Sequence, residues 1–450
     1  MHSVDATTEQ MIRSVLAYAE NRLRLDPVPL DQGCQDPADL EAAMSGLIGE
    51  EGHNPDQVLG VYAATVAPAV ISADSPRFLG FIPAAPTKAS LLFDMLVSCA
   101  SIQGISWLEA AGAIHAENQV LALIARRAGL PPQAGGCFVS GGSAANLSAL
   151  AVAREMAKRA AGAGRAGRRW RVAVGSDAHS SIGNTLRLLE MDPLIVPSAD
   201  HRLTGEAVQA ALKADDDPAS VAAVVATAGT TNAGMIDPLS ECAEIARGHG
   251  LWYHIDAAWG GAMIASERLR GALRGLERAD SATIDAHKWF ATTMGCGMFL
   301  VRDGREPSHV FQVAASYMPS RELLIDPYMN TAQWSRRFLG LRLFLSLASA
   351  GWSGHAAHIE RAVAQAARIR AGLEAQGWSI VNDSPLAVLS AVPPAALGDA
   401  RAVVERVLKS GRAWVSLAHF EERDVVRICV THGETSDEDL SILIHALTTR

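Results

Sequence analysis

The sequence predicts an α/β fold in which a mainly parallel sheet has helices on both faces. Helices without a sheet precede it, and a small α+β unit follows. From about residue 135 onward, short apolar runs alternate with helical patterns, and continuous β-branched runs of this kind indicate strands buried on both faces. The candidate strands are residues 137–140, 171–174, 194–196, 221–226 and 251–255. Functional groups are then expected at the ends of such strands.

The first 75 residues form a predicted arm. A helical pattern covers residues 8–25, a loop rich in Asp, Pro and Gly follows over 26–39, and two more helices are expected after it. Helices without a sheet of their own must bury their apolar stripes on another body. That body is either the rest of the chain or a second subunit.

After residue 334 a long helical stretch runs toward residue 349. The pattern beyond residue 354 predicts a helix over 359–375, strands near 378 and 386, a helix over 399–409, strands near 413 and 425, and a last helix. We therefore divide the chain into a helical arm (1–75), a large domain (76–350) and a small C-terminal α+β domain (351–450).

The amino-acid composition argues against several classes of binding partner. The 450 residues are 49% hydrophobic, enough for a real core, and their net charge of −9 argues against nucleic acid or an anionic membrane. The six cysteines form neither a Cys-x-x-Cys pair nor a zinc-like spacing with histidine, so we expect no disulfide framework and no metal site. The N-terminal residues include Asp5 and Glu9 instead of the basic stretch and apolar run of a secretory signal. No apolar run is long enough to span a membrane. The expected location is cytoplasmic.

Lys288 is the leading candidate for a reactive group. It lies between His287 and Trp289, just after a β-like stretch. Desolvation in an apolar neighbourhood drives a lysine toward its neutral, nucleophilic form, which can form a Schiff base with a carbonyl. Taken alone, a single lysine is far more often a solvated surface charge.

Residues 138–150 predict a strand, a tight glycine turn and the start of a helix, so that backbone N–H groups and the helix dipole converge near Gly142 and Ser143. This arrangement is typical of a phosphate site. It matches neither a P-loop nor the Gly-x-Gly-x-x-Gly dinucleotide pattern. The alternative is a plain turn with a Ser cap.

Three more polar residues end or follow predicted strands. Asp256 precedes small residues that let a flat ligand approach, and an acid there can hold a pyridinium proton. The ring of His179 could stack on a planar cofactor, and Thr227 could donate a hydrogen bond to a ring substituent. Each of the three alone also fits a structural role at a strand end or turn. Together with Lys288 and the glycine turn, however, they make five strand-end groups in order, which coincidence explains poorly.

This set resembles the pyridoxal-phosphate-dependent decarboxylases of the aromatic-amino-acid and glutamate decarboxylase group. The strongest segments are His254-Ile-Asp-Ala-Ala-Trp-Gly-Gly261 and Asp280-Ser-Ala-Thr-Ile-Asp-Ala-His-Lys-Trp289, and weaker similarity runs from about residue 75 to the C-terminus. The resemblance implies the aspartate-aminotransferase-like fold (fold type I) with a seven-stranded sheet. It also implies pyridoxal 5′-phosphate as cofactor and a homodimer with sites at the subunit boundary.

The resemblance further implies a role for each matching residue. Lys288 forms the internal aldimine, Asp256 pairs with the pyridine nitrogen, Ala258 packs beneath the ring, His179 stacks above it as a catalytic residue, Gly142 and Ser143 bind phosphate with His287 nearby, Thr227 approaches the ring hydroxyl or the carboxylate region, and Ser335 reaches the partner's phosphate. Asp285 stands where several relatives carry Asn, and its negative charge would repel a phosphate.

Relatives also carry a mobile loop with a tyrosine that protonates the quinonoid carbon once carbon dioxide has left. Tyr317 is the candidate here, in a loop between the strand ending near residue 301 and the helix near 334. A Tyr at this position favours simple decarboxylation over the oxygen-consuming, aldehyde-forming variants, which tend to carry Phe. The alternative is an ordinary loop tyrosine.

The predicted function is therefore decarboxylation of an L-amino acid to its amine and carbon dioxide. The alternatives are a decarboxylating aldehyde synthase, an aminotransferase, a carbon–carbon lyase acting on a phosphorylated amino alcohol, and a non-catalytic scaffold. The intact Lys288, Asp256 and His179 argue against the scaffold.

The resemblance places Phe81, Ile82 and Ile105 in the substrate side-chain pocket, which would make that pocket apolar and medium-sized. Core packing is the alternative explanation for all three. Arg427 could meet a substrate carboxylate, although strand arginines more often pair with neighbouring surface acids. The amino acid itself is not named by the sequence.

Overall fold

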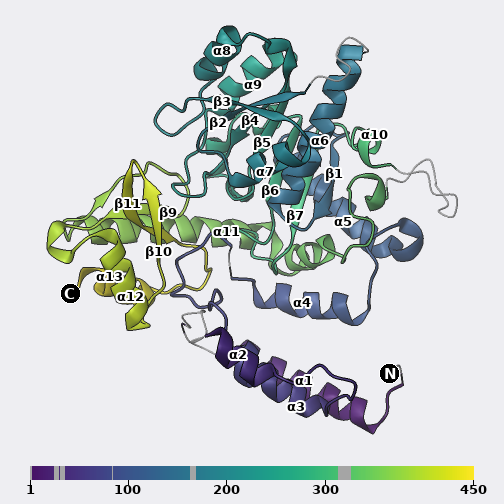
Figure 1. Ribbon diagram of the computed structural model, residues 1–450, viewed down its shortest axis with the longest axis vertical. Helices are drawn as coiled ribbons and strands as arrows, with labels where there is room; N and C mark the ends of the chain where they lie inside the picture. The colour runs from purple at the N-terminus through teal and green to yellow at the C-terminus, as the bar shows by residue number, and fades with distance from the viewer. Residues whose placement is uncertain are drawn as a thin grey trace.

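A seven-stranded sheet forms the centre of the molecule in this computed structural model, which describes residues 3–24, 30, 36–83, 85–162, 169–312 and 326–449 (Figure 1). The strands lie in the order β1 (Gly135–Val139), β7 (Gly297–Val301), β6 (Ser281–Asp285), β5 (Trp252–Asp256), β4 (Val221–Thr227), β2 (Arg171–Gly175) and β3 (Asp192–Val196). Only β7 is antiparallel to its neighbours in this sheet. The predicted mainly parallel sheet of seven strands is confirmed.

Helices cover both faces of this sheet, as the continuously apolar strands require. Successive residues of β4 show the two faces, since Val224 and Ala226 belong to one apolar core and Ala223 and Val225 to another. The helices of this part of the chain are α5 (Trp107–Arg127), α6 (Gly142–Ala161), α7 (Ser180–Leu188), α8 (Gly205–Ala214), α9 (Leu239–Gly248) and α10 (Ser308–Phe311). Every residue of β4, β6 and β7 is buried between the helical layers.

The C-terminal part carries a second, antiparallel sheet in the order β10-β11-β9-β8 (Figure 1). Its elements are β8 (Ser379–Ile380), β9 (Val388–Val392), β10 (Ser416–Phe420), β11 (Arg423–Cys429), α12 (Ala400–Ser410) and α13 (Asp437–Thr448). Helix α11 (Gly340–Glu374) leads into it and is broken at Gly351, whose φ of 71° departs from helical geometry. The two helices predicted for this stretch are therefore one element with a break. The first of them begins at Gly340, six residues after Trp334, because the segment before it is bonded to other parts of the chain.

The N-terminal part consists of α1 (Ala6–Arg24), α2 (Pro37–Met44), α3 (Pro55–Val61) and a π-helical turn over Tyr62–Val66. None of these four elements contains a buried residue. Figure 1 shows them as a separate layer below α4 (Lys88–Cys99), which packs against α11. Short 3-10 turns complete the described chain at Pro218–Ser220, Gly260–Ala265, Arg270–Leu273, Leu276–Arg278, Pro327–Met329 and Ala395–Leu397. Across the described ranges, no helix is both long and apolar enough to cross a membrane.

Candidate active site

A cavity of about 490 Å³ opens at the edge of the large sheet where the parallel strands end. Most of the residues predicted for the site line this cavity: Phe81, Ile82, Gly142, Ser143, His179, Thr227, Asp256, Ala258, Asp285, His287 and Lys288. They follow five different strands, β1, β2, β4, β5 and β6, whose carboxyl ends meet at this edge, apart from Phe81 and Ile82, which lie in the segment before α4. The structure thus brings the five predicted strand-end groups into one space.

Lys288 lies in the turn after β6, with its side chain only 21% exposed. Its Nζ is 3.2 Å from Oδ2 of Asp285, whose side chain is almost fully buried. The backbone of the turn is fixed because the N–H groups of Ala286 and His287 both donate to Cys296 O. A primary amine is therefore held at the cavity wall by a carboxylate of its own turn.

The glycine turn before α6 leaves no room for side chains. A Cβ on Gly142 would lie 2.9 Å from Oδ2 of Asp285, and one on Gly297 would lie 2.7 Å from Oδ1 of the same residue. Gly141, with a φ of 151°, has a conformation that residues with a side chain rarely adopt. The backbone can therefore approach a ligand closely at the start of α6.

Unpaired hydrogen-bonding groups surround this turn. The N–H groups of Gly142 and Ser143 have no acceptor among the described residues, as expected at a helix start. Oδ1 of Asp285 is buried without a hydrogen-bond partner there. Burial lowers the pKa of His287, which favours the neutral form of its ring. The free donors fit a phosphate, whereas the carboxylate of Asp285 does not add to that fit.

Asp256 ends β5 on the floor of the cavity, and its side chain is held on both oxygens. Asn146 donates its Nδ2–H to Oδ2 at 2.9 Å, and the N–H of Ala258 donates to Oδ1 at 3.2 Å. Hydrogen bonds to a carboxylate favour its ionised form. Asp256 can therefore accept a proton-bearing ring nitrogen, as a pyridinium would present.

His179 caps the start of α7, where its Nδ1 accepts the N–H of Ser181 at 3.2 Å and lies 2.9 Å from the hydroxyl of that serine. Thr227 is anchored differently, because its N–H donates to Oδ2 of Asp237 at 2.7 Å. Both residues are therefore fixed at strand ends and line the cavity. A structural role and a place in the lining of the cavity are thus combined in these two residues.

No role was predicted for Asn146, Ser181, Thr230 or Thr231, all of which line the cavity. The one available signal for Asn146 was its amide among the mostly small side chains in the first turns of α6. Arg427 also lines the cavity, although strand arginines more often pair with surface acids. It is buried and donates to the carbonyls of Gly80 and Thr231 at 2.8 and 2.7 Å, and it has no carboxylate partner among the described residues.

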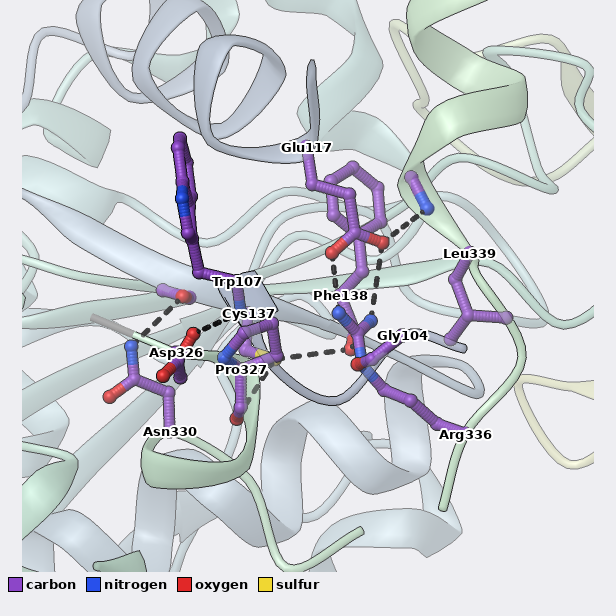
Figure 2. A network of polar contacts seen from close by, with 12 residues as sticks. Gly104, Trp107, Glu117, Cys137, Phe138, Asp326, Pro327, Asn330, Arg336 and Leu339 are labelled. Atoms are coloured by element: carbon purple, nitrogen blue, oxygen red, sulfur yellow. Dashed lines mark hydrogen bonds and ion pairs between the residues drawn. The ribbon is translucent and has the colours of Figure 1, made fainter. Parts of the chain in front are cut away.

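Three predicted residues are not in this cavity. Tyr317 lies outside the described residues. Ile105 and Ser335 line a different hollow on the surface, together with Arg336 and Arg337. Figure 2 shows what holds these segments there: the guanidinium of Arg336 donates to Gly104 O at 2.6 Å.

Arg336 is also the centre of a buried network that ties the surface hollow to the end of β1 (Figure 2). Its guanidinium pairs with Glu117 of α5 at 2.5 Å and donates to Phe138 O at 3.2 Å. Glu117 in turn accepts the N–H of Gly340 at 2.7 Å, which sets the start of α11. This network explains why that helix begins later than its sequence pattern predicts.

The cavity as a whole presents a primary amine, free N–H groups at a helix start and an ionised carboxylate on its floor. These are the groups needed to hold an aldehyde, a phosphate and a protonated ring nitrogen, which together describe pyridoxal phosphate. Fold and cavity thus define a class, the enzymes that hold this cofactor on a lysine at the ends of parallel strands.

Comparison with known proteins narrows this class. A family model for the pyridoxal-dependent decarboxylase conserved domain matches residues 37–388. An aromatic-L-amino-acid decarboxylase of Bacillus atrophaeus is 29% identical over 420 residues, which cover 89% of this chain and 86% of the relative. A histidine decarboxylase of Rattus norvegicus is 28% identical over 472 residues, which cover 98% of this chain and 70% of the relative. A crystal structure of Oryza sativa TDC with PLP and tryptamine matches with a TM-score of 0.92 at 24% identity, covering 100% of this chain and 99% of that one.

The chain belongs to the pyridoxal-dependent decarboxylase family. The predicted family, fold type and cofactor are confirmed, and so is the reaction class, decarboxylation of an amino acid. The roles of individual residues, the substrate and the oligomeric state remain predictions.

Proposed function

We propose that the cavity around Lys288 decarboxylates an L-amino acid to its amine and carbon dioxide. The observation that carries this proposal is the convergence of Lys288, the start of α6 and Asp256 on one cavity of about 490 Å³. When bound, pyridoxal phosphate supplies a sink for the electron pair that remains after carbon dioxide leaves.

Each residue of the cavity then has a proposed role in holding the cofactor. Lys288 holds the cofactor covalently, Asp256 keeps the ring nitrogen protonated, and the N–H groups of Gly142 and Ser143 bind the phosphate. Ala258 and His179 bound the two faces of the ring, and Thr227 holds a ring substituent. His287 lies beside the phosphate.

The cavity favours a substrate with one carboxylate. Among the described residues that line it, Lys288 and Arg427 are the two lysine or arginine side chains. Lys288 is committed to the cofactor, so Arg427 remains as the cation that can meet the α-carboxylate. A substrate with a second carboxylate in its side chain would place that charge against the apolar Phe81 and Ile82. An aromatic or other uncharged side chain of medium size fits this wall better.

Tyr317 is proposed as the group that returns a proton to the substrate carbon. Replacing it with Phe should then leave carbon dioxide release possible but hinder amine formation, so that dioxygen and water convert the decarboxylated substrate to aldehyde, ammonia and hydrogen peroxide. Unchanged amine yield from Tyr317→Phe would assign the proton to another group.

We also propose a homodimer. The first helices expose apolar side chains, for example Val15 at 44% and Leu16 at 54%, and α4 exposes Leu92 and Leu96. Burying such a face on a second copy is the ordinary way to complete it. Ile105 and Ser335 line a surface hollow beside α4, where a second copy would meet them, and Ser335 would then be placed to reach the partner's phosphate. The division into 1–75, 76–350 and 351–450 and a cytoplasmic location belong to the same proposal.

The decisive experiment loads the purified protein with pyridoxal phosphate and measures product from a panel of amino acids. We expect a yellow absorbance band that borohydride abolishes, with a cofactor adduct on the peptide containing Lys288. Amine and carbon dioxide should form in equal amounts, without keto acid, aldehyde or peroxide. Keto acid as the main product would instead identify an aminotransferase, and aldehyde with peroxide an aldehyde synthase.

A further inference from the structure

A connected set of buried polar groups lies below the cavity and involves Asn146, a residue outside the predicted site. Asn146 is in the second turn of α6 and is 1% exposed. Its amide makes four hydrogen bonds to residues of three different elements. The partners are Asp256 of β5, Ser181 at the start of α7, His254 of β5 and Thr283 of β6.

The orientation of this amide is set by Asp256. An ionised carboxylate can only accept, so the group that faces Oδ2 of Asp256 at 2.9 Å must be the NH₂ of Asn146. The same NH₂ donates to the hydroxyl of Ser181 at 2.9 Å. The carbonyl oxygen of Asn146 then faces Thr283 Oγ1 at 2.7 Å and His254 Nε2 at 3.0 Å, and both must donate to it.

The same reasoning selects one tautomer of a neutral His254. Its Nε2 carries the proton given to Asn146, so in the neutral ring Nδ1 is the acceptor for the hydroxyl of Ser281 at 2.9 Å. Ser281 Oγ can donate to it and also accepts the indole Nε1–H of Trp252 at 2.8 Å. Burial lowers the pKa of His254, in agreement with a neutral ring. Asp256 thus has a neutral histidine beneath it rather than a cation.

The other branch reaches His179. The hydroxyl of Ser181 accepts from Asn146 and is left with its own proton to donate to His179 Nδ1 at 2.9 Å. The backbone N–H of Ser181 points at the same nitrogen at 3.2 Å. Two donors at Nδ1 require that this nitrogen be unprotonated, which leaves the proton of a neutral His179 on Nε2. Nε2 has no hydrogen-bond partner among the described residues, and the ring lines the cavity.

We propose that Asn146 is a positioning residue that couples the ionised state of Asp256 to the Nε2–H tautomer of His179. The inference rests on the proposed roles of Asp256 and His179 against the cofactor. One amide holds the carboxylate below the ring as an acceptor, and through Ser181 it holds the histidine above the ring as a donor. The titratable groups around the amide are Asp256 and His254, and His179 lies one hydrogen bond further.

Asn146→Asp is the sharpest test, because it keeps the shape of the side chain and replaces the donor that faces Asp256 by an acceptor. Two carboxylates in contact raise each other's pKa, so near pH 6 the new carboxyl group keeps a proton that it can donate to Asp256, whereas near pH 8 that proton is lost and the two charges repel each other. We expect the dissociation constant for pyridoxal phosphate to rise at least about tenfold at pH 8 and to fall again toward pH 6. The absorbance spectrum of the bound cofactor should also change with pH over this range more than the wild-type spectrum does.

Ser148→Ala is the matched control, since Ser148 is buried on the same helix and its hydroxyl bonds only to Ala144 O among the described residues. Its cofactor affinity should stay within about twofold of wild type. Ser181→Ala tests the second branch even if the Asp variant does not fold. We expect it to bind the cofactor normally and to lose about tenfold in kcat, because His179 loses one of the two donors that fix its tautomer.

Wild-type affinity and a pH-independent spectrum in Asn146→Asp would overturn the coupling, as would wild-type kcat in Ser181→Ala. These results are distinguishable from a failure of the proposed function. In that case the wild-type protein itself would show no lysine-bound cofactor or no amine product, whatever the variants do.

Discussion

Beneath the cavity, polar side chains are buried and bonded to one another, whereas along the N-terminal helices apolar side chains face outward. Asn146, His254 and Asp256 are almost inaccessible and share their hydrogen bonds. Ile48, by contrast, is 99% exposed, and α1 contains no buried residue. Both arrangements are costly for an isolated chain unless a partner compensates. In the first region the chain supplies the partners itself, and in the second region they are missing from a single copy.

This comparison separates what one chain completes from what needs something else. Among the described residues around the cavity, the N–H groups of Gly142 and Ser143 are left free to face a cofactor, whereas Oδ1 of Asp285 and Nε1 of Trp259 are buried without a hydrogen-bond partner. The N-terminal helices are incomplete as a whole face. Substitutions beneath the cavity should therefore change catalytic activity or stability. Substitutions on the N-terminal helices should instead change oligomerisation.

The largest effect is expected at Lys288. Lys288→Ala removes the amine that holds the cofactor, so turnover should fall by at least about 10³-fold, and borohydride should no longer fix pyridoxal phosphate to the protein. Amine and carbon dioxide release measure the first effect, and peptide mass the second. Lys213→Ala, at an exposed position on α8, is the control and should retain full activity. Full turnover by Lys288→Ala would mean that the active site lies outside this cavity.

The buried pair of Glu117 and Arg336 should give the largest effect on folding. Glu117→Gln leaves a buried guanidinium without its counter-charge and should lower the free energy of unfolding by about 3–5 kcal/mol, measured by denaturant titration. The comparison is with Glu20→Gln in α1, which breaks an exposed i,i+4 pair to Arg24. That change should cost less than about 0.5 kcal/mol. Equal losses of unfolding free energy in the two variants would mean that burial does not make the Glu117–Arg336 pair more important for stability than the exposed pair.

Local and long-range features differ in how far the sequence could predict them. The strand-end groups were found because each sits in a short pattern, a strand followed by a turn, and parallel strands bring their ends together. The bond between Asn146 and Asp256 joins residues 110 apart, and that between Glu117 and Arg336 joins residues 219 apart. No local sequence pattern indicates such long-range pairings. The network of Glu117 and Arg336 delays the start of α11 to Gly340, so the helical periodicity alone could not predict where this helix begins.

An apolar-to-charged change on α1 tests the incomplete face. Leu16→Glu should weaken a dimer by about 10- to 100-fold in dissociation constant, because the charge would have to be buried against the second copy. Sedimentation equilibrium over a concentration series measures the shift. Asn21→Asp adds the same charge to the same helix at an exposed polar position and should leave assembly unchanged. If the wild type is a monomer at micromolar concentration with full activity, the proposed dimer is wrong.

The smallest effect is expected from pH at a buried histidine. Burial, together with the nearby His355 and His432, lowers the pKa of His358 to about 4. The unfolded chain has a value near 6.5, so the folded chain binds fewer protons below that pH. The stability that the neutral ring contributes is present above about pH 6.5 and is lost as the pH falls toward 4. Between pH 7 and 5.5 the loss should be about 1 kcal/mol.

His358→Leu cannot be protonated, so its free energy of unfolding should fall by about 1 kcal/mol less than that of the wild type over this pH interval. His53→Gln provides the control from the N-terminal part, because His53 is exposed and should not change the slope of stability against pH. Denaturant titrations at the two pH values measure all three proteins. An unchanged slope in His358→Leu would mean that His358 takes up its proton in the folded chain as readily as in the unfolded one, which its burial should prevent.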